Sequence, residues 1–152
     1  ELSGQTVEER PDPELKVDVE ARIPAEYVED ERLRLRFYKR LAASRDTSEV
    51  SSIASEMADR FGAPPKAATD LIRLMRIKVL ARDAGLAGLV ARTGSIVLNA
   101  CAGSEDALNH VAATARSLGL RTGDPTRQDT LTVLLPKFPE MDVLEVAERI
   151  LA

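Results

Sequence analysis

Residues 65–84, PKAATDLIRLMRIKVLARDA, decide the fold, because they form the most apolar helical stretch of the chain. Their apolar side chains follow a helical period and cover much of the helix circumference instead of a single stripe. These side chains belong to Leu71, Ile72, Leu74, Met75, Ile77, Val79 and Leu80. Pro64 and Pro65 stop the preceding helix and start this one, and Gly85 closes it. The stretch therefore predicts the central and most enclosed helix of the domain.

One strand and two amphipathic helices are predicted upstream of the central helix. Residues 14–21 alternate apolar and polar side chains, which is typical of a half-buried strand. Residues 30–44 and 47–61 repeat apolar side chains at helical spacing, and Asp46 with Glu49 has the spacing of a capping box. The first half of the chain is therefore predicted to be a strand followed by three helices.

Downstream of Gly85 the pattern changes to short β-type runs separated by helices. Thr93 and Gly94 are predicted to turn a hairpin, and Ser104 is predicted to cap a helix. The predicted strands are 88–92, 95–100 and 130–135, and the predicted helices are 105–118 and 141–151. The element order predicts an α+β fold, with a helical N-terminal half followed by a small sheet with packed helices.

Composition and charge bound the class of protein. The chain has 152 residues, 44% of them hydrophobic, which is enough for one buried core. Residues 1–31 hold eleven acids against three bases, a net charge of −8, which leaves +4 for residues 32–152. We interpret residues 1–13 as an acidic linker and 14–152 as one domain, with a subdivision near residue 86 left open. A chain that begins with Glu is expected to be cut from a longer protein.

Cysteine usage and hydropathy point to the cytoplasm and away from membranes. Cys101 is the single cysteine, so no internal disulfide is expected. No apolar run reaches the roughly 20 residues that a membrane helix needs, and no signal-peptide pattern is present. We therefore expect a cytoplasmic protein without a membrane partner.

No catalytic constellation is evident. A phosphate-binding loop would end in Gly-Lys-Ser or Gly-Lys-Thr, and the segment around Lys66 lacks this pattern. His110 and Cys101 stand alone, which favours a helix-surface histidine and a half-buried cysteine over a metal site or a nucleophilic pair. Glu105 and Asp106 fit a helix start, where acids complement the dipole. We therefore predict no catalytic residues, no metal site and no bound cofactor.

Two basic helix faces are candidate contacts for DNA phosphates. They consist of Arg32, Arg36, Lys39 and Arg40 on one helix, and Arg73, Arg76 and Arg82 on another. The alternative is that they are solvated or neutralise the acidic leader. Phe37 and Tyr38 belong to the apolar face of the first helix, so the Gly-rich or aromatic interleaving of a single-strand binding surface is not expected in these basic rows. The net charge of −4 also disfavours an autonomous nucleic-acid binder.

A polar stripe on the helix over 47–61 is the candidate partner-binding surface. Its members recur every three or four residues opposite the apolar face, and they are Glu49, Ser52, Glu56 and Asp59. Glu56 and Asp59 stand near the C-terminal end, where the helix dipole disfavours acids by about 0.3–1 kcal/mol each. A basic partner would explain them. The alternative is a solvated face whose acids pair with Arg60 or with a neighbouring helix.

An ordered series of motifs between Leu15 and Leu86 resembles a known family. The series runs Ile23-Pro24-Ala25-Glu26-Tyr27-Val28, Asp30-Glu31-Arg32-Leu33, Phe37-Tyr38-Lys39-Arg40-Leu41-Ala42, then Asp59-Arg60-Phe61-Gly62 and Pro64-Pro65. In this order and spacing it resembles the C-terminal domain of bacterial transcription-repair coupling factors. The resemblance covers about residues 8–86, roughly half of the chain, and the rest is placed by continuity.

The resemblance implies a function for the parent protein and for this part of it. The parent would be an ATP-powered DNA translocase that binds RNA polymerase stalled at a lesion and recruits excision repair through UvrA. This domain would be a non-catalytic, monomeric regulatory module that docks on a UvrB-like domain of the same polypeptide and masks the UvrA-recruiting surface. Glu56 and Asp59 match acidic contact positions of the family. The alternative is a nucleic-acid-binding accessory domain of the motor that uses the basic faces.

Overall fold

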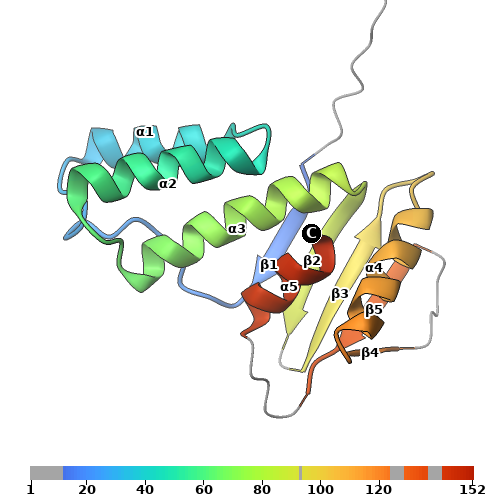
Figure 1. The fold of residues 1–152 in the computed structure, drawn as a ribbon. Coiled ribbons are helices and arrows are strands. Elements are labelled where there is room, and N and C mark those ends of the chain that lie inside the picture. The colour runs from blue at the N-terminus through green and yellow to red at the C-terminus, as the bar shows by residue number, and fades with distance from the viewer. Residues whose placement is uncertain (1–11, 93, 124–128, 137–141) are drawn as a thin grey trace, which may run out of the picture.

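The computed structural model describes residues 12–92, 94–123, 129–136 and 142–152, which form five helices and five strands (Figure 1). In chain order these are β1 (Glu14–Val17), α1 (Glu31–Ala42), α2 (Thr47–Phe61), α3 (Lys66–Asp83), β2 (Leu86–Arg92), β3 (Ser95–Ala100), α4 (Asp106–Ser117), β4 (Arg121–Thr122), β5 (Thr130–Leu134) and α5 (Val143–Leu151). The predicted α+β fold, with three helices between the first strand and the rest of the sheet, is confirmed.

The five strands form one mixed sheet in the order β1-β2-β3-β5-β4. Strand β1 runs parallel to β2, with Leu15 opposite Leu89, and every other pair is antiparallel. The three helices α1–α3 are therefore the crossover that a parallel pair of strands requires. The N-terminal strand belongs to the same sheet as the second half of the chain, so the two halves share their backbone hydrogen bonds.

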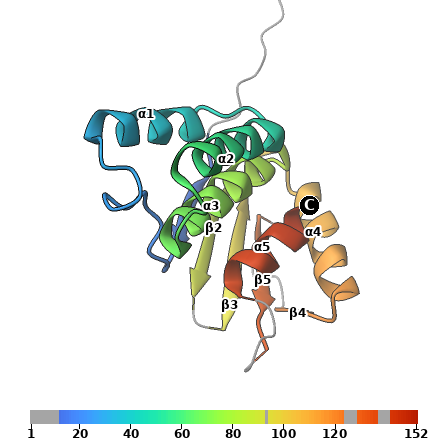
Figure 2. The same ribbon diagram turned by 60° about the vertical axis from the view of Figure 1, so that its left-hand side comes forward.

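The helices form two layers on one side of the sheet. Figures 1 and 2 place α3, α4 and α5 over the same sheet face, with α1 and α2 stacked beyond α3. Contacts of α3 with α2, α5 and β2 agree with this arrangement. The prediction that the stretch around residues 65–84 is the central helix is confirmed.

Two hydrophobic clusters fill the space between these layers, and α3 contributes to both. Ile77 and Ala81 belong to the cluster over the sheet, and Leu71, Ile72 and Val79 belong to the cluster shared with α1 and α2. Five positions of one helix are thus buried on two faces, which explains why its apolar residues surround it instead of forming a stripe. The predicted boundaries of the linker and domain stay predictions, and of the linker only Asp12 and Pro13 lie within the described residues.

Three local expectations require correction. The strand predicted over 14–21 ends at Val17, where the amide of Val19 donates to the Val17 carbonyl at 2.9 Å and bends the chain away from β2. Ser104 does not cap α4: Glu105 occupies the cap position without a side-chain bond to an amide of the helix, and Ser104 already lies in a turn. The two-residue strand β4 was not predicted, because two residues carry no periodicity. Met141, the expected start of the last helix, lies outside the described residues.

Candidate functional site

The start of α2 fixes the first member of the predicted stripe. Asp46 accepts from the Glu49 amide at 2.9 Å and from the Ser48 hydroxyl at 2.7 Å. In return the Glu49 carboxylate accepts from the Arg45 amide at 2.9 Å, one residue before the cap position. The reciprocal arrangement predicted for Asp46 and Glu49 is therefore present, displaced by one amide. These bonds commit Glu49 to the helix terminus, so it is a poor candidate for contact with a partner.

Glu56 is held by two arginines. Its two carboxylate oxygens accept from the two terminal nitrogens of Arg40 on α1, at 2.9 Å each, in the parallel fork that arginine and carboxylate favour. Arg60, one turn further along α2, donates to the same carboxylate at 3.3 Å. These bonds, with Arg40 first, hold the pKa of Glu56 below its ordinary value. For Glu56 the structure thus contains the pairing by Arg60 and by a neighbouring helix that was the alternative to a partner contact.

Asp59 and Ser52 differ from Glu56, because both are exposed and neither has a side-chain ion pair or hydrogen bond to the described part of the chain. Asp59 lies within one turn of the C-terminal end of α2, at Phe61. No ion pair in the described domain therefore compensates for the unfavourable interaction of this carboxylate with the helix dipole. Of the four predicted residues, Asp59 is the carboxylate that is open to a visiting cation.

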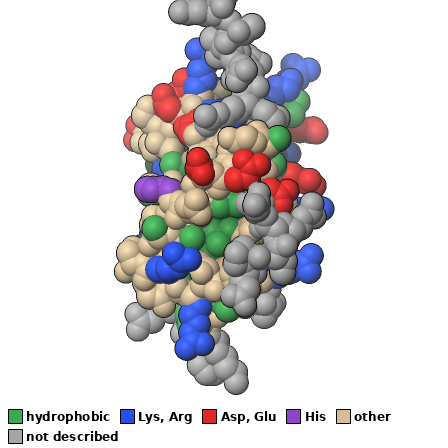
Figure 3. Space-filling view, turned by 90° about the vertical axis from the view of Figure 1, so that its right-hand side faces the viewer, with side chains coloured by type: hydrophobic (Ala, Val, Ile, Leu, Met, Phe, Trp, Pro, Cys, Tyr) green, Lys and Arg blue, Asp and Glu red, His purple; other side chains and the backbone are tan. Residues whose placement is uncertain are grey.

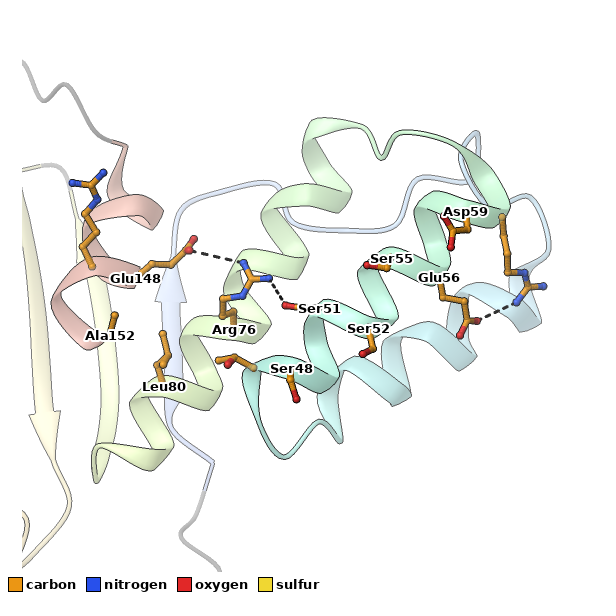
Figure 4. Close-up of a pocket in the computed structure, with 13 residues that line it drawn as sticks. Ser48, Ser51, Ser52, Ser55, Glu56, Asp59, Arg76, Leu80, Glu148 and Ala152 are labelled. Carbon is orange, nitrogen blue, oxygen red and sulfur yellow. Dashed lines mark hydrogen bonds and ion pairs between the residues drawn. The ribbon is translucent and has the colours of Figure 1, made fainter.

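A groove of about 1100 Å³ runs beside the stripe, between α2, α3 and α5. Figure 4 shows Ser48, Ser52 and Ser55 following α2 along this groove, with Glu56 and Asp59 toward one end. The opposite wall includes Glu148 of α5, Ala152 directly after α5, and Arg76 of α3. Sequence reasoning missed the groove, because its second wall comes from residues about ninety positions further along the chain. The serine spacing on α2 was the one local signal.

The basic row on α3 is engaged inside the domain. Arg73 binds Asp142 through both terminal nitrogens at 3.0 Å and binds Glu148 at 2.8 Å. Arg76 donates to the Ser51 hydroxyl at 3.0 Å, and Arg82 donates to the Arg45 carbonyl. These arginines join α3 to α5, to α2 and to the turn before α2. The row was a candidate phosphate surface from sequence, and the structure gives it a structural role.

The basic row on α1 remains exposed. Arg40 is engaged with Glu56, whereas Arg32, Arg36 and Lys39 have no side-chain ion pair to the described residues. Leu35, whose residue surface is 54% exposed, lies on the same outward face. Of the two candidate basic rows, the row on α1 is therefore the one whose described cations stay available for a DNA contact.

Replacing Arg73 with Met is expected to lower the free energy of unfolding by about 1–2 kcal/mol at pH 7. Three carboxylates then lose a cation, namely Asp142, Glu148 and Asp70, which lies 3.8 Å from Arg73. Arg73 lowers the pKa of Asp142, so this stabilisation is present above the pKa that Asp142 has when unfolded and is lost as the pH falls through the lower folded pKa. The difference between variant and parent should shrink below about pH 4. Urea unfolding at several pH values measures it, and Arg149→Met, which removes an exposed pair with Glu145, is the matched control. An equal loss of unfolding free energy in both variants would contradict the structural role of Arg73.

The remaining reactive side chains are dispersed. His110 is exposed on α4 and Cys101 is half-buried. Among the described residues no group of His, Cys, Asp and Glu has the arrangement of a metal site, and none of the helices there is long and apolar enough to cross a membrane. A hollow of about 390 Å³ lies between α4 and β5. Figure 3 shows that side of the molecule, with apolar side chains in the middle and carboxylates above them.

Comparison with known proteins places the chain in a family. The model of the TRCF domain matches residues 17–110, so the likeness extends past residue 86 into α4. The transcription-repair-coupling factor of Mycobacterium tuberculosis is 37% identical over 97 residues, which is 62% of this chain and 8% of that protein. That of Myxococcus xanthus is 34% identical over 98 residues, covering 64% of this chain and 8% of that protein. The chain thus spans about 8% of the length of these relatives.

A solved structure supports the fold independently. The crystal structure of the C-terminal domain of a transcription-repair coupling factor superposes with a TM-score of 0.79 at 18% identity, covering 94% of this chain and 89% of that one. At this identity the likeness concerns the fold. Together with a family model that matches more than half of the sequence, it leads to one conclusion: the chain belongs to the TRCF domain family of transcription-repair coupling factors.

Proposed function

We propose that this domain is the non-catalytic regulatory module of an ATP-driven DNA translocase that couples transcription to excision repair. In the proposal it docks on a UvrB-like domain of the same polypeptide and masks the surface that recruits UvrA. The parent would bind RNA polymerase and DNA and would work in the bacterial cytoplasm. Family membership supports the setting, and the exposed C-terminal edge of α2 supports the docking surface.

Asp59 is the observation that carries the proposal. Its carboxylate is exposed, has no partner in the described part of the domain and stands at the helix end that disfavours it. The stability of the domain therefore gives no reason for an acid at this position. A cationic side chain on a docking surface gives one, because close charge pairs across an interface can couple by roughly 1.5–7 kcal/mol.

The serine face beside Asp59 allows a partner to come close. Ser48, Ser52 and Ser55 are short side chains that line one side of the groove. A surface of low relief permits backbone elements of a partner to approach α2. The partner is therefore expected to place an arginine or lysine near Asp59 and to lie along the serines.

A weak contact is sufficient for this regulation. A flexible tether gives an effective concentration on the order of 1 mM, so an intrinsic dissociation constant of about 100 µM would keep the domain docked about ten to one. An activating event that supplies a few kcal/mol would reverse this ratio. A much tighter contact would prevent the switch from opening.

Deleting residues 14–152 from the full-length protein tests the proposal. Because the docked form would be favoured about ten to one, the deletion should raise the apparent affinity for UvrA about tenfold. The measurement is UvrA binding by fluorescence anisotropy, with duplex DNA binding measured in parallel. Unchanged UvrA binding would refute the regulatory role. Weaker DNA binding, steeply dependent on salt, would favour the accessory DNA-binding function, for which exposed Arg32, Arg36 and Lys39 are the supporting observation.

A further inference from the structure

We infer that Arg40 is an internal competitor within the docking surface: it occupies Glu56 in the undocked domain and must share or release that carboxylate when a partner's arginine or lysine arrives. The inference rests on the proposed function and concerns the regulation of the same surface. It assigns different roles to the two acids, with Asp59 as the first contact and Glu56 as a second contact held in reserve.

The geometry around Glu56 supports this assignment. The Arg40 fork uses one lone pair on each carboxylate oxygen at 2.9 Å, and Arg60 uses another at 3.3 Å. A carboxylate offers about four such positions, so about one remains. A partner cation therefore meets a carboxylate that is mostly occupied, whereas at Asp59 it meets one without a partner in the described domain.

The local charge balance leads to the same conclusion. Arg40 and Arg60 bring two positive charges, and Glu56 and Asp59 bring two negative charges, so the cluster is neutral at pH 7. A further cation at Glu56 would be repelled by the two arginines unless one of them moves away. The affinity of the edge for a basic partner is therefore set by the placement of Arg40 as well as by the number of acids.

Arg40 keeps a second contact, with an aromatic ring, after it releases Glu56. Its guanidinium lies 5.5 Å from the centre of the Phe37 ring, and that of Arg60 lies 5.2 Å from the Phe61 ring. Each arginine would keep this cation–π contact when the carboxylate turns to a partner. The aromatic rings thus lower the cost of exchange, and both phenylalanines are held in the helical cluster.

Replacing Arg40 with Gln in the full-length protein removes the competitor and tests the inference. The domain should dock more tightly, by roughly two- to fivefold, which is the range of one exposed ion pair. Salt weakens such contacts and so exposes the surface that binds UvrA. Tighter docking should therefore raise the salt concentration at which half of the molecules bind UvrA. UvrA binding is normalised at each salt concentration to the Glu56→Lys, Asp59→Lys protein, which serves as the open reference. Thermal unfolding verifies that the variants are folded.

The matched control is Arg36→Gln, which removes the same charge one turn earlier on α1, from a residue without an ion pair to the described part of the domain. It should shift the salt midpoint by clearly less than Arg40→Gln. Glu56→Gln should abolish the effect of Arg40→Gln when the two are combined. Arg40→Lys should restore part of the competition, because an ammonium keeps the charge but not the fork.

The outcomes separate this inference from the proposed function. Equal shifts from Arg36→Gln and Arg40→Gln, or looser docking after Arg40→Gln, would overturn the role of Arg40 as a competitor while leaving the docking itself intact. If the double lysine protein binds UvrA no better than the unaltered protein at any salt concentration, the proposed docking surface fails first.

Discussion

Full-length protein carrying Glu56→Lys and Asp59→Lys is expected to bind UvrA about tenfold more tightly than the unaltered protein, matching the deletion of the domain. The size of the effect is limited by the docking ratio, because a domain that is docked about ten to one hides all but about a tenth of the recruiting surface. Reversal at Asp59 turns a carboxylate that has no partner in the described part of the domain into a repelling cation. Reversal at Glu56 places a third cation beside Arg40 and Arg60.

The control for this prediction is Glu105→Lys with Asp106→Lys, which makes the same change in net charge at the start of α4. Both acids are exposed, and they lie far from α2 in the sequence. This variant should bind UvrA like the unaltered protein if the effect is local. Thermal unfolding verifies that the double lysine protein is folded. If this folded protein keeps the UvrA affinity of the unaltered protein, Glu56 and Asp59 do not belong to the docking surface. An equal gain from the control would assign the effect to net charge.

The helices were predictable from sequence because their signals are local. Apolar spacing and the Asp46–Glu49 pair placed α2 at the observed residues, and the prolines and Gly85 bounded α3 within about a residue. The C-terminal end of β1 and the existence of β4 were not predictable in this way. Both depend on pairing with strands that are distant in sequence, at Gly88 to Ala91 and at Val133 and Leu134.

In the candidate site, too, local features were predictable from sequence and contacts between distant residues were not. Helical periodicity placed Ser52, Glu56 and Asp59 on one exposed stripe, and the structure keeps them there. Helical periodicity could not indicate that Arg40, sixteen residues earlier, binds Glu56, or that α5 forms the other wall of the groove. The arginines of α3 give the clearest example. Arg73, which looks solvated in sequence, binds Asp142 and Glu148, about seventy residues away.

The second large expected effect is a loss of stability when a buried isoleucine of α3 is replaced. Ile77 is fully buried in the cluster over the sheet, and Ile72 is buried in the helical cluster on another side of α3. Replacing either with Ala should lower the free energy of unfolding by about 2–5 kcal/mol, the range for a buried isoleucine that leaves a cavity. Leu35→Ala, at an exposed position on α1, is the control and should change little.

The two isoleucines also test whether the chain divides near residue 86. The tyrosines, Tyr27 and Tyr38, both pack against the helical cluster, so tyrosine fluorescence reports on that cluster, whereas far-ultraviolet circular dichroism reports on all helices and strands. Because α3 supplies side chains to both clusters and β1 pairs with β2, we expect one cooperative transition. Ile77→Ala should then lower the urea midpoint seen by tyrosine fluorescence as much as that seen by circular dichroism. If the tyrosine midpoint stays in place while the dichroism transition splits, the sheet unfolds by itself and the chain contains two units joined by α3.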